Sequence, residues 1–179
     1  MGGDFVDKLT IKKAKKSEST KYNNLEKIIF KDSYYTKINY TLTHSKITEK
    51  DYFINYNSKT IGTLSIGNSI EFGGKFGIGI VGLKKEFRNK GIGKKVIILC
   101  KKFAKKEKET QIFLSVPLLD NETISIFEKL GFKKHHIETN IQYKDGTKFL
   151  RCRNDQLKHL ILTTNDYKKL GWQIMCSEV

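Results

Sequence analysis

A basic, glycine-rich turn from Arg88 to Gly93 is the stretch of this sequence best suited to binding a ligand. A strand-like run from Phe76 to Leu83 precedes the turn, and apolar residues at helical spacing follow it as far as Lys106. The first turn of a helix leaves backbone N–H groups unpaired and carries the positive end of the helix dipole. Glycines at alternate positions let that backbone approach an anion closely, so the pattern predicts a phosphate site.

The three cysteines point to neither a disulfide framework nor a zinc site. Cys100, Cys152 and Cys176 are odd in number, widely spaced and without a Cys-x-x-Cys pair or a histidine cluster. Cys100 falls on the apolar face of the helix after the turn, where a small buried thiol is the ordinary outcome. We therefore expect no metal and no cysteine nucleophile.

The elements before the turn form a meander with one helix. Leu9 and Ile11 alternate as in a first strand, and Asp51 to Ile66 reads as a hairpin. A helix is predicted over Tyr22 to Phe30, capped by Ser19 or Thr20. Its buried face is expected to hold Leu25, Ile28 and Ile29. Between helix and hairpin, a short second helix or irregular loop over Lys31 to Lys50 carries the pocket candidates Tyr34, Tyr35 and Tyr40.

After the helix that follows the turn, the pattern continues with a buried strand, a helix and a hairpin. The strand runs from Gln111 to Val116, and Asp120 or Asn121 caps a helix that ends at Leu130 before Gly131. The hairpin pairs Ile137 to Tyr143 with Lys148 to Cys152. For the C-terminal part we predict a short helix over Asp166 to Leu170 and a strand from Trp172 to Met175.

Composition predicts a single domain over 1–179, with residues 1–7 frayed and 154–179 as a C-terminal extension. The apolar runs are far shorter than a membrane span, so we expect a cytoplasmic protein with no membrane partner. The formal net charge is +15, but only three of the 34 basic residues are Arg. Arg is the residue suited to bidentate phosphate contacts. The scarcity of Arg therefore favours a positive charge that is simply spread over the solvated surface. Binding of an acidic partner other than a phosphorylated cofactor is the less favoured explanation.

Two separated motifs resemble the GCN5-related N-acetyltransferase (GNAT) superfamily. The family's cofactor motif, Arg/Gln-x-x-Gly-x-Gly/Ala at a helix start, is matched by Arg88 to Gly93. The phrase Ile126 to Phe132 (Ile-Phe-Glu-Lys-Leu-Gly-Phe) is similar to the end of the family's next helix. The resemblance covers roughly residues 8 to 153.

This resemblance implies an α+β fold with a mostly antiparallel, splayed central sheet and helices on both faces. Acetyl-CoA would enter the split between the strands at Ile78 to Leu83 and Ile112 to Val116. The pantetheine arm would meet main-chain groups of the first strand, and the pyrophosphate would sit on the turn. The residues expected to contact acetyl-CoA are Val81, Gly82, Leu83, Arg88, Asn89, Lys90, Gly91, Ile92, Gly93, Lys94, Asp120, Asn121 and Phe127.

The implied reaction, acetyl transfer to a primary amine, needs groups that move protons. An alkylamine with a pKa near ~10 must first lose its proton, which costs roughly 4 kcal/mol at neutral pH. Glu71, before the central strand, is the first candidate base, with His135 and His136 behind it. Phe127 stands where the family commonly has a Tyr that protonates the departing thiolate. Tyr143 or water can replace that Tyr.

The acceptor and the partners are left open by these patterns. The basic exterior mildly favours an acidic protein, an RNA-linked acceptor or a phosphorylated one, and the segment after Asn154, with Trp172 and Ile174, could give a homodimer an edge strand. Two other functions stay in view. Phe127 suggests a catalytically weak acyl-CoA-binding module, and the charge suggests an RNA-binding protein. An enzyme that acetylates a charged tRNA would combine both features.

Overall fold

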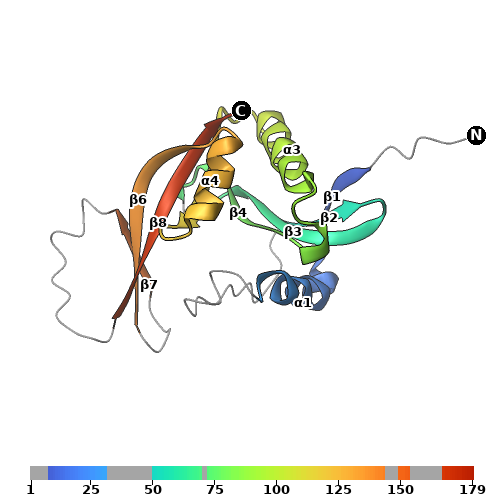
Figure 1. The fold of residues 1–179 in the computed structure, drawn as a ribbon, viewed down its shortest axis with the longest axis horizontal. Helices are drawn as coiled ribbons and strands as arrows, with labels where there is room; N and C mark the ends of the chain where they lie inside the picture. Colours follow the sequence, from blue (N-terminus) through green and yellow to red (C-terminus); the bar gives the residue numbers. More distant parts are fainter. Residues whose placement is uncertain (1–7, 32–49, 70–71, 144–148, 154–166) are drawn as a thin grey trace, which may run out of the picture. The chain divides into compact units, whose positions relative to one another are not determined.

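The computed structural model describes residues 8–31, 50–69, 72–143, 149–153 and 167–179, with side chains between 139 and 170 excepted. The chain divides into two compact units, Met1–Ile112 with Val179, and Phe113–Glu178. Figure 1 shows the elements of both units along the chain. Tyr34, Tyr35, Tyr40 and Glu71 lie outside the described residues. The single-domain expectation stays a prediction.

The first unit contains a four-stranded antiparallel sheet in the order β1-β2-β3-β4. The predicted hairpin is confirmed, and Asn57 and Ser58 form its turn with φ angles of 46° and 65°. Apolar residues alternate with polar ones in some of its strands and follow one another in others, because helices cover both faces of the sheet. The strands are β1 (Leu9–Lys13), β2 (Asp51–Tyr56), β3 (Lys59–Asn68) and β4 (Phe76–Leu83).

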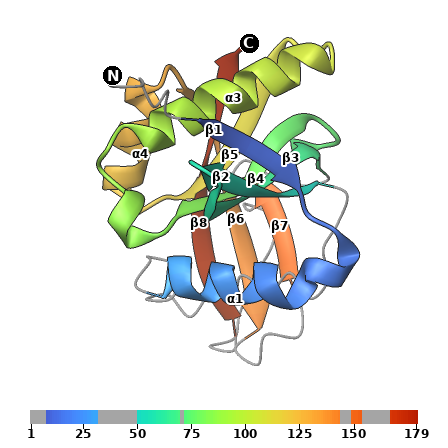
Figure 2. The same cartoon turned by 90° about the vertical axis from the view of Figure 1, so that its right-hand side faces the viewer.

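Helices α1 (Ser19–Phe30) and α3 (Ile92–Lys106) cover opposite faces of this sheet, as Figure 2 shows. Successive side chains of a strand point to opposite faces. Phe53 of β2 meets Tyr22 of α1 with ring centroids 5.4 Å apart, and Tyr52 meets Phe103 of α3 at 5.8 Å. Helices on both faces of the sheet are therefore confirmed within this unit.

The buried face of α1 differs from the prediction. Ile28 is 65% exposed, whereas Tyr22, Leu25, Glu26 and Ile29 are buried. These four residues follow the i, i+3, i+4, i+7 spacing of one helical stripe, which leaves Ile28 on the solvent side. The predicted cap is wrong as well, because the 3-10 helix Lys16–Glu18 leads directly into α1 and no side chain caps its start.

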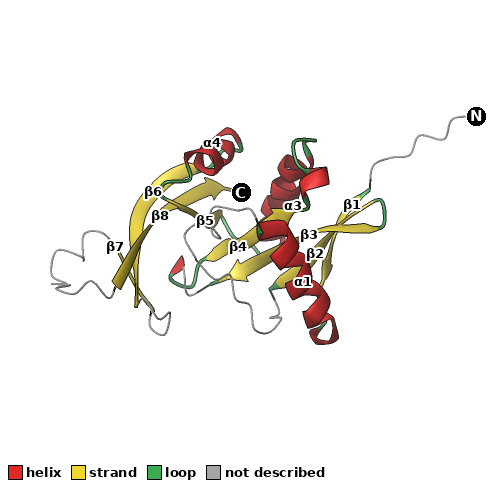
Figure 3. Cartoon of the chain, turned by 60° about the horizontal axis from the view of Figure 1, so that its bottom comes forward, coloured by secondary structure: helices red, strands yellow, loops and turns green. Residues whose placement is uncertain are grey.

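The described part of the second unit holds strands in the order β5-β8-β6-β7 and the helix α4, and Figure 3 colours strands yellow and helices red. β6 pairs antiparallel with both β7 and β8. The predicted cap and end of α4 are confirmed by Asp120 and by Gly131, whose φ is 85°. Its elements are β5 (Gln111–Pro117), α4 (Asn121–Lys129), β6 (Lys133–Tyr143), β7 (Phe149–Arg153) and β8 (Tyr167–Glu178).

The C-terminal segment corrects two expectations. β8 begins at Tyr167, so the helix predicted over Asp166 to Leu170 is wrong for its last four residues. β8 also lies between β5 and β6, and Trp172 and Ile174 are 4% and 1% exposed. They fill the core of this unit and offer no edge strand to a partner. A homodimer stays a prediction without that support.

The fold is a mixed α+β fold with a mostly antiparallel sheet, as predicted from the sequence. Within the described ranges, each helix is too short or too polar to cross a lipid bilayer.

Candidate functional site

The turn between β4 and α3 is built around two left-handed residues. After Leu83 the chain makes a 3-10 turn, Lys85–Phe87, and then passes through Asn89 at φ 58° and Gly91 at φ 73°. Glycine and asparagine are the residues that adopt this region at least cost. The sequence of the turn therefore fits the backbone that it must adopt.

The start of α3 is open to a ligand. Gly91 occupies the N-cap position, and in the described chain no side chain caps the first turn. A Cβ atom built on either Gly91 or Gly93 would meet nothing within 4 Å, and Lys90 and Lys94 are exposed beside them. Unpaired N–H groups, a positive helix end and lysines are the donors that a phosphate requires. The turn therefore fits the pyrophosphate of a nucleotide-like cofactor such as CoA.

Arg88 uses its side chain in a way that the motif did not predict. Its Nε donates to the carbonyl of Leu83 at 2.8 Å, and one terminal nitrogen donates to the carbonyl of Ile29 at 2.6 Å. These bonds join the end of β4 to the last turn of α1, whose carbonyls have no partner within the helix. The guanidinium thus holds the turn in place, and its backbone stays available to a ligand.

β4 carries the half-buried residues Val81 and Gly82, which were expected to meet the pantetheine arm. A Cβ at Gly82 would lie 2.5 Å from Cγ2 of Ile29 and 2.6 Å from Cζ of Phe30. Only glycine therefore allows α1 to lie this close to the strand. β4 also contains a bulge, because Ser65 pairs with Ile80 whereas Ile66 pairs with Ile78. This bulge was not predicted from the sequence, and it leaves Gly79 exposed.

The remaining cofactor candidates belong to the second unit and lie at α4. The Asp120 carboxylate accepts a hydrogen bond from the Thr123 N–H at 3.1 Å, so it caps the helix. Asn121 is exposed. The half-buried Phe127 packs edge-on against Phe132, with ring centroids 5.5 Å apart. As a cap, Asp120 already has a structural role.

The proton-transfer candidates are described only in part. His135 is exposed in β6, its Nδ1 lies 2.6 Å from Nδ1 of His136, and its ring meets Phe113. His136 in turn contacts Glu138, with 2.8 Å between Nε2 and Oε1. Glu71 and the side chain of Tyr143 lie outside the described residues.

Two further expectations from the sequence concern a cysteine nucleophile and a bound metal ion. Burial raises the pKa of Cys100 to about 12, so a thiolate nucleophile is disfavoured there, as predicted. Within the described side chains, no group of three or more His, Cys, Asp or Glu residues is placed to hold a metal ion.

A set of buried polar residues beneath α1 was not predicted from the sequence. Glu26 and Asp51 are 5% and 0% exposed, and Thr63 and Ser65 are buried beside them on β3. A signal was present in the sequence, because Glu26 falls at helical spacing with Tyr22 and Ile29. A carboxylate in an apolar stripe is costly to bury, so the sequence alone already makes Glu26 an unusual residue at this position.

Comparison with protein families identifies the class. Residues 19–132, more than half of the chain, match the model of the acetyltransferase (GNAT) family. The protein belongs to this family, as the two sequence motifs predicted. Among curated proteins, no sequence matches the chain.

Solved structures give the same fold. An Elizabethkingia anophelis GNAT family acetyltransferase with acetyl-CoA bound is 16% identical at a TM-score of 0.57, covering 96% of this chain and 98% of its own. The ribosomal-protein-S18-alanine N-acetyltransferase of Escherichia coli is 13% identical at 0.58, covering 96% and 94%. An Arabidopsis thaliana protein in complex with the bisubstrate analogue CoA-Ac-MVNAL is 14% identical at 0.56, covering 96% and 99%. At such identities the likeness concerns the fold.

Proposed function

We propose that this protein transfers the acetyl group of acetyl-CoA to a primary amine, directly and within a ternary complex. The observation that carries the proposal is the uncapped start of α3, where Gly91 and Gly93 leave room for a phosphate. Membership of the acetyltransferase family supports acetyl-CoA as the donor. The buried Cys100 supports direct transfer, because it offers no thiolate for a covalent intermediate.

In the proposed complex the turn binds the pyrophosphate through backbone N–H groups, which form charge-assisted hydrogen bonds. Lys90 and Lys94 add attraction at longer range. Val81, Gly82 and Leu83 are proposed to contact the pantetheine arm, and Asp120, Asn121 and Phe127 stay further candidates for cofactor contact. When bound, acetyl-CoA supplies an activated thioester, and the chain orients it and removes the proton of the amine.

Glu71, His135 and Tyr143 are proposed for proton transfer at the acceptor. The need for such groups is physical, since only the neutral form of an amine attacks a thioester. For the acceptor we propose to begin with peptide amines. Two of the similar structures are named for a ribosomal-protein-S18-alanine N-acetyltransferase and for the bisubstrate analogue CoA-Ac-MVNAL. An acidic protein and an RNA-linked acceptor are the next candidates. The cytoplasm is the proposed location.

Calorimetric titration with acetyl-CoA tests the donor half of the proposal. Gly93 has an ordinary φ and open space at its Cβ position, so the Gly93→Val variant should fold. Its side chain should occupy the space proposed for the phosphate. We expect this variant to bind acetyl-CoA at least about tenfold more weakly, as expected from losing one charge-assisted hydrogen bond. Lys102→Ala, on the exposed side of the same helix, is the control and should bind as the wild type does. Equal affinity in all three proteins would contradict the site.

Phe127 favours a second candidate, an acyl-CoA-binding module with weak or no catalysis. Its ring packs on Phe132 and carries no hydroxyl that could protonate a thiolate. A thiolate with a pKa near ~8.5 is a good leaving group, so this loss is tolerable for an enzyme. Binding of acetyl-CoA without release of CoA in the presence of peptide, lysine, polyamine and aminosugar acceptors would favour the module.

A further inference from the structure

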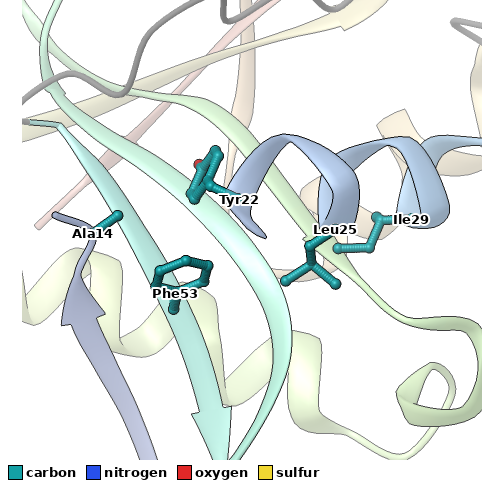
Figure 4. Packing of buried hydrophobic residues seen from close by; sticks show 5 residues of the cluster. All are labelled: Ala14, Tyr22, Leu25, Ile29 and Phe53. Atoms are coloured by element: carbon teal, nitrogen blue, oxygen red, sulfur yellow. The ribbon is translucent and has the colours of Figure 1, made fainter. Parts of the chain in front are cut away.

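Helix α1 covers a carboxyl group that its apolar surroundings do not explain. Figure 4 shows Tyr22, Leu25 and Ile29 of α1 with Phe53 of β2, in an apolar core whose residues are each at most 7% exposed. Glu26 lies in the same helical stripe at 5% exposure, and its Oε1 has no hydrogen-bond partner within the described chain. A buried, unpaired carboxylate oxygen is costly, so this group calls for a proton or a ligand.

Two other polar groups act on Glu26 from the elements packed around it, the fully buried Asp51 of β2 and Tyr22 of α1. The buried Thr63 of β3 interacts with Tyr22. Burial, and then the charge of Asp51, raise the pKa of Glu26 to about 7, although the Tyr22 hydroxyl acts in the opposite direction. The same burial, with Glu26 and Asp51, raises the pKa of Tyr22. Among the residues that the structure describes, no cation contributes to the pKa of Glu26.

The strand register connects this carboxyl pair to the bulge of β4. Asp51 lies directly opposite Ser65, and side chains at directly opposite positions of an antiparallel pair share a face with Cβ atoms about 5 Å apart. Ser65 pairs with Ile80, next to the bulged residue Gly79. A Cβ on Gly79 would lie 3.6 Å from the Ser65 hydroxyl oxygen, and Gly79 is exposed. The Ser65 hydroxyl therefore stands between the buried acids and the open side of β4.

We propose that Ser65, Asp51 and Glu26 form a proton-accepting line that takes the proton of the acceptor amine at the β4 bulge during acetyl transfer. The proposal rests on the function proposed above, and in it this line takes the amine proton in place of Glu71 or His135. In the step, the C–N bond forms and the C–S bond breaks. The amine proton passes to the Ser65 hydroxyl, whose own proton moves on to the carboxylate pair. CoA leaves as a thiolate and takes a proton from water, and the carboxylate pair gives its proton to the hydroxide that remains, which regenerates the base.

The environment of the pair suits this task. A base works best when its pKa lies near the working pH, because it is then both unprotonated and strong enough to accept a proton. Burial, and then the negative charge of Asp51, disfavour the ionised form of Glu26 and so raise its pKa towards neutrality. Bulges also occur next to active sites, where they redirect the chain.

A pH–rate profile of Glu26→Gln tests the line. With acetyl-CoA and the peptide, lysine, polyamine or aminosugar acceptor that releases CoA fastest, kcat/KM of the wild type should rise with pH up to about 7 and then level. Glu26→Gln, which is neutral and of the same shape, should be at least about tenfold slower and lose this ionisation. Glu18→Gln, with the same charge change at a half-buried position before α1, should keep the wild-type profile.

Thermal unfolding supplies an independent readout on Glu26. A carboxyl whose folded pKa is raised stabilises the fold below its unfolded pKa, and this stabilisation is lost as the pH rises through about 7. Glu26→Gln should therefore raise Tm relative to the wild type at pH 8 and leave it nearly unchanged at pH 4. Ser65→Ala should lower kcat/KM while leaving this pH dependence of Tm in place.

The outcomes separate the two proposals. Turnover by Glu26→Gln with the rate and pH profile of the wild type would overturn the proton-accepting line alone. Turnover by Ser65→Ala at the wild-type rate would overturn the role of Ser65 in passing the proton to the carboxylate pair. Absence of amine-dependent CoA release by the wild type would overturn the proposed function, and the line with it.

Discussion

Helices α3 and α4 each begin a few residues after a strand, yet their first turns are finished differently. At α4 the Asp120 carboxylate accepts the Thr123 N–H at 3.1 Å, and the helix end is satisfied by the protein itself. At α3 the N-cap is Gly91 and no side chain of the described residues performs this task. A helix start completed by its own cap contributes to stability, whereas one left incomplete keeps its donors for a ligand.

The same contrast applies to charge around the two turns. The α3 turn is lined by lysines, and its one arginine, Arg88, is already bonded to Leu83 and Ile29. The first turn of α4 carries Asp120 and Glu122, whose negative charges interact favourably with the positive end of the helix dipole, so no external anion is needed there. We therefore propose that the start of α3 binds the phosphates of the ligand. At the start of α4 the cap formed by Asp120 has a structural role, and contact of Asp120 and Asn121 with the cofactor stays a prediction.

Giving α3 an acidic cap should produce the largest effect. Gly91→Asp places a carboxylate at the N-cap, where it competes with the phosphate for the same N–H groups. Asp and Asn tolerate the left-handed conformation better than other residues with side chains, and Gly91 has a φ of 73°. We expect acetyl-CoA affinity to fall about 100-fold, the loss that ~2.7 kcal/mol represents. Gly91→Asn is the uncharged control, and similar affinities for the two variants in calorimetry would contradict an electrostatic role of the turn.

Replacing Arg88 should weaken the fold more than its charge would suggest. Arg88→Lys keeps the positive charge but cannot reach both carbonyl groups, so at least one of the two hydrogen bonds is lost. We expect the free energy of unfolding to fall by about 1–3 kcal/mol, measured by denaturant titration. Lys85→Ala is a control from the same turn, and its exposed side chain should matter little. An unchanged stability in Arg88→Lys would show that these bonds do not hold the turn.

Removing the cap of α4 should have a smaller effect, and this effect should be on stability and not on acetyl-CoA binding. Asp120→Ala should lower the free energy of unfolding by about 1 kcal/mol, and Asp120→Asn, which can still cap, should lower it less. Acetyl-CoA affinity should stay unchanged in both variants if Asp120 is a cap alone. A loss of affinity in calorimetry without a loss of stability would instead make Asp120 a cofactor contact.

The smallest effect concerns Glu18, at the start of α1. Its carboxylate accepts a hydrogen bond from the Lys15 N–H at 3.0 Å, which lowers the pKa of Glu18, with nearby lysines adding to this. A lowered folded pKa stabilises the protein above the unfolded pKa, and the stabilisation disappears as the pH falls through the folded pKa. Glu18→Gln should therefore reduce Tm slightly at pH 7 and not at pH 2. A larger loss at acidic pH would contradict this sign.

Most of the fold was predictable from local signals in the sequence. The hairpin over Asp51 to Ile66, the glycine turn and the cap at Asp120 follow from turn chemistry and helical spacing, and all three are confirmed. The signals failed where tertiary packing decides. Tyr167 to Leu170 has no strong period of its own, and it becomes a strand by pairing with β6.

The candidate site was predictable in its backbone and less so in its side chains. The motif located the turn, but the bonds from Arg88 to Leu83 and Ile29 depend on how α1 lies on β4. Glu26 was overlooked because Ile28 was preferred for the buried stripe, although it is 65% exposed. The line from Glu26 to Ser65 joins three elements, so strand register is needed to recognise it.

The central claim is that the donor site at α3 serves acetyl transfer to an amine. Its most direct test measures CoA release by the purified protein with acetyl-CoA and each acceptor in turn, while mass spectrometry follows the amine. We expect release that saturates with acetyl-CoA, depends on the amine and matches the acetylated product one to one. Tight binding of acetyl-CoA with no amine-dependent release from any acceptor would contradict the claim and favour the binding module.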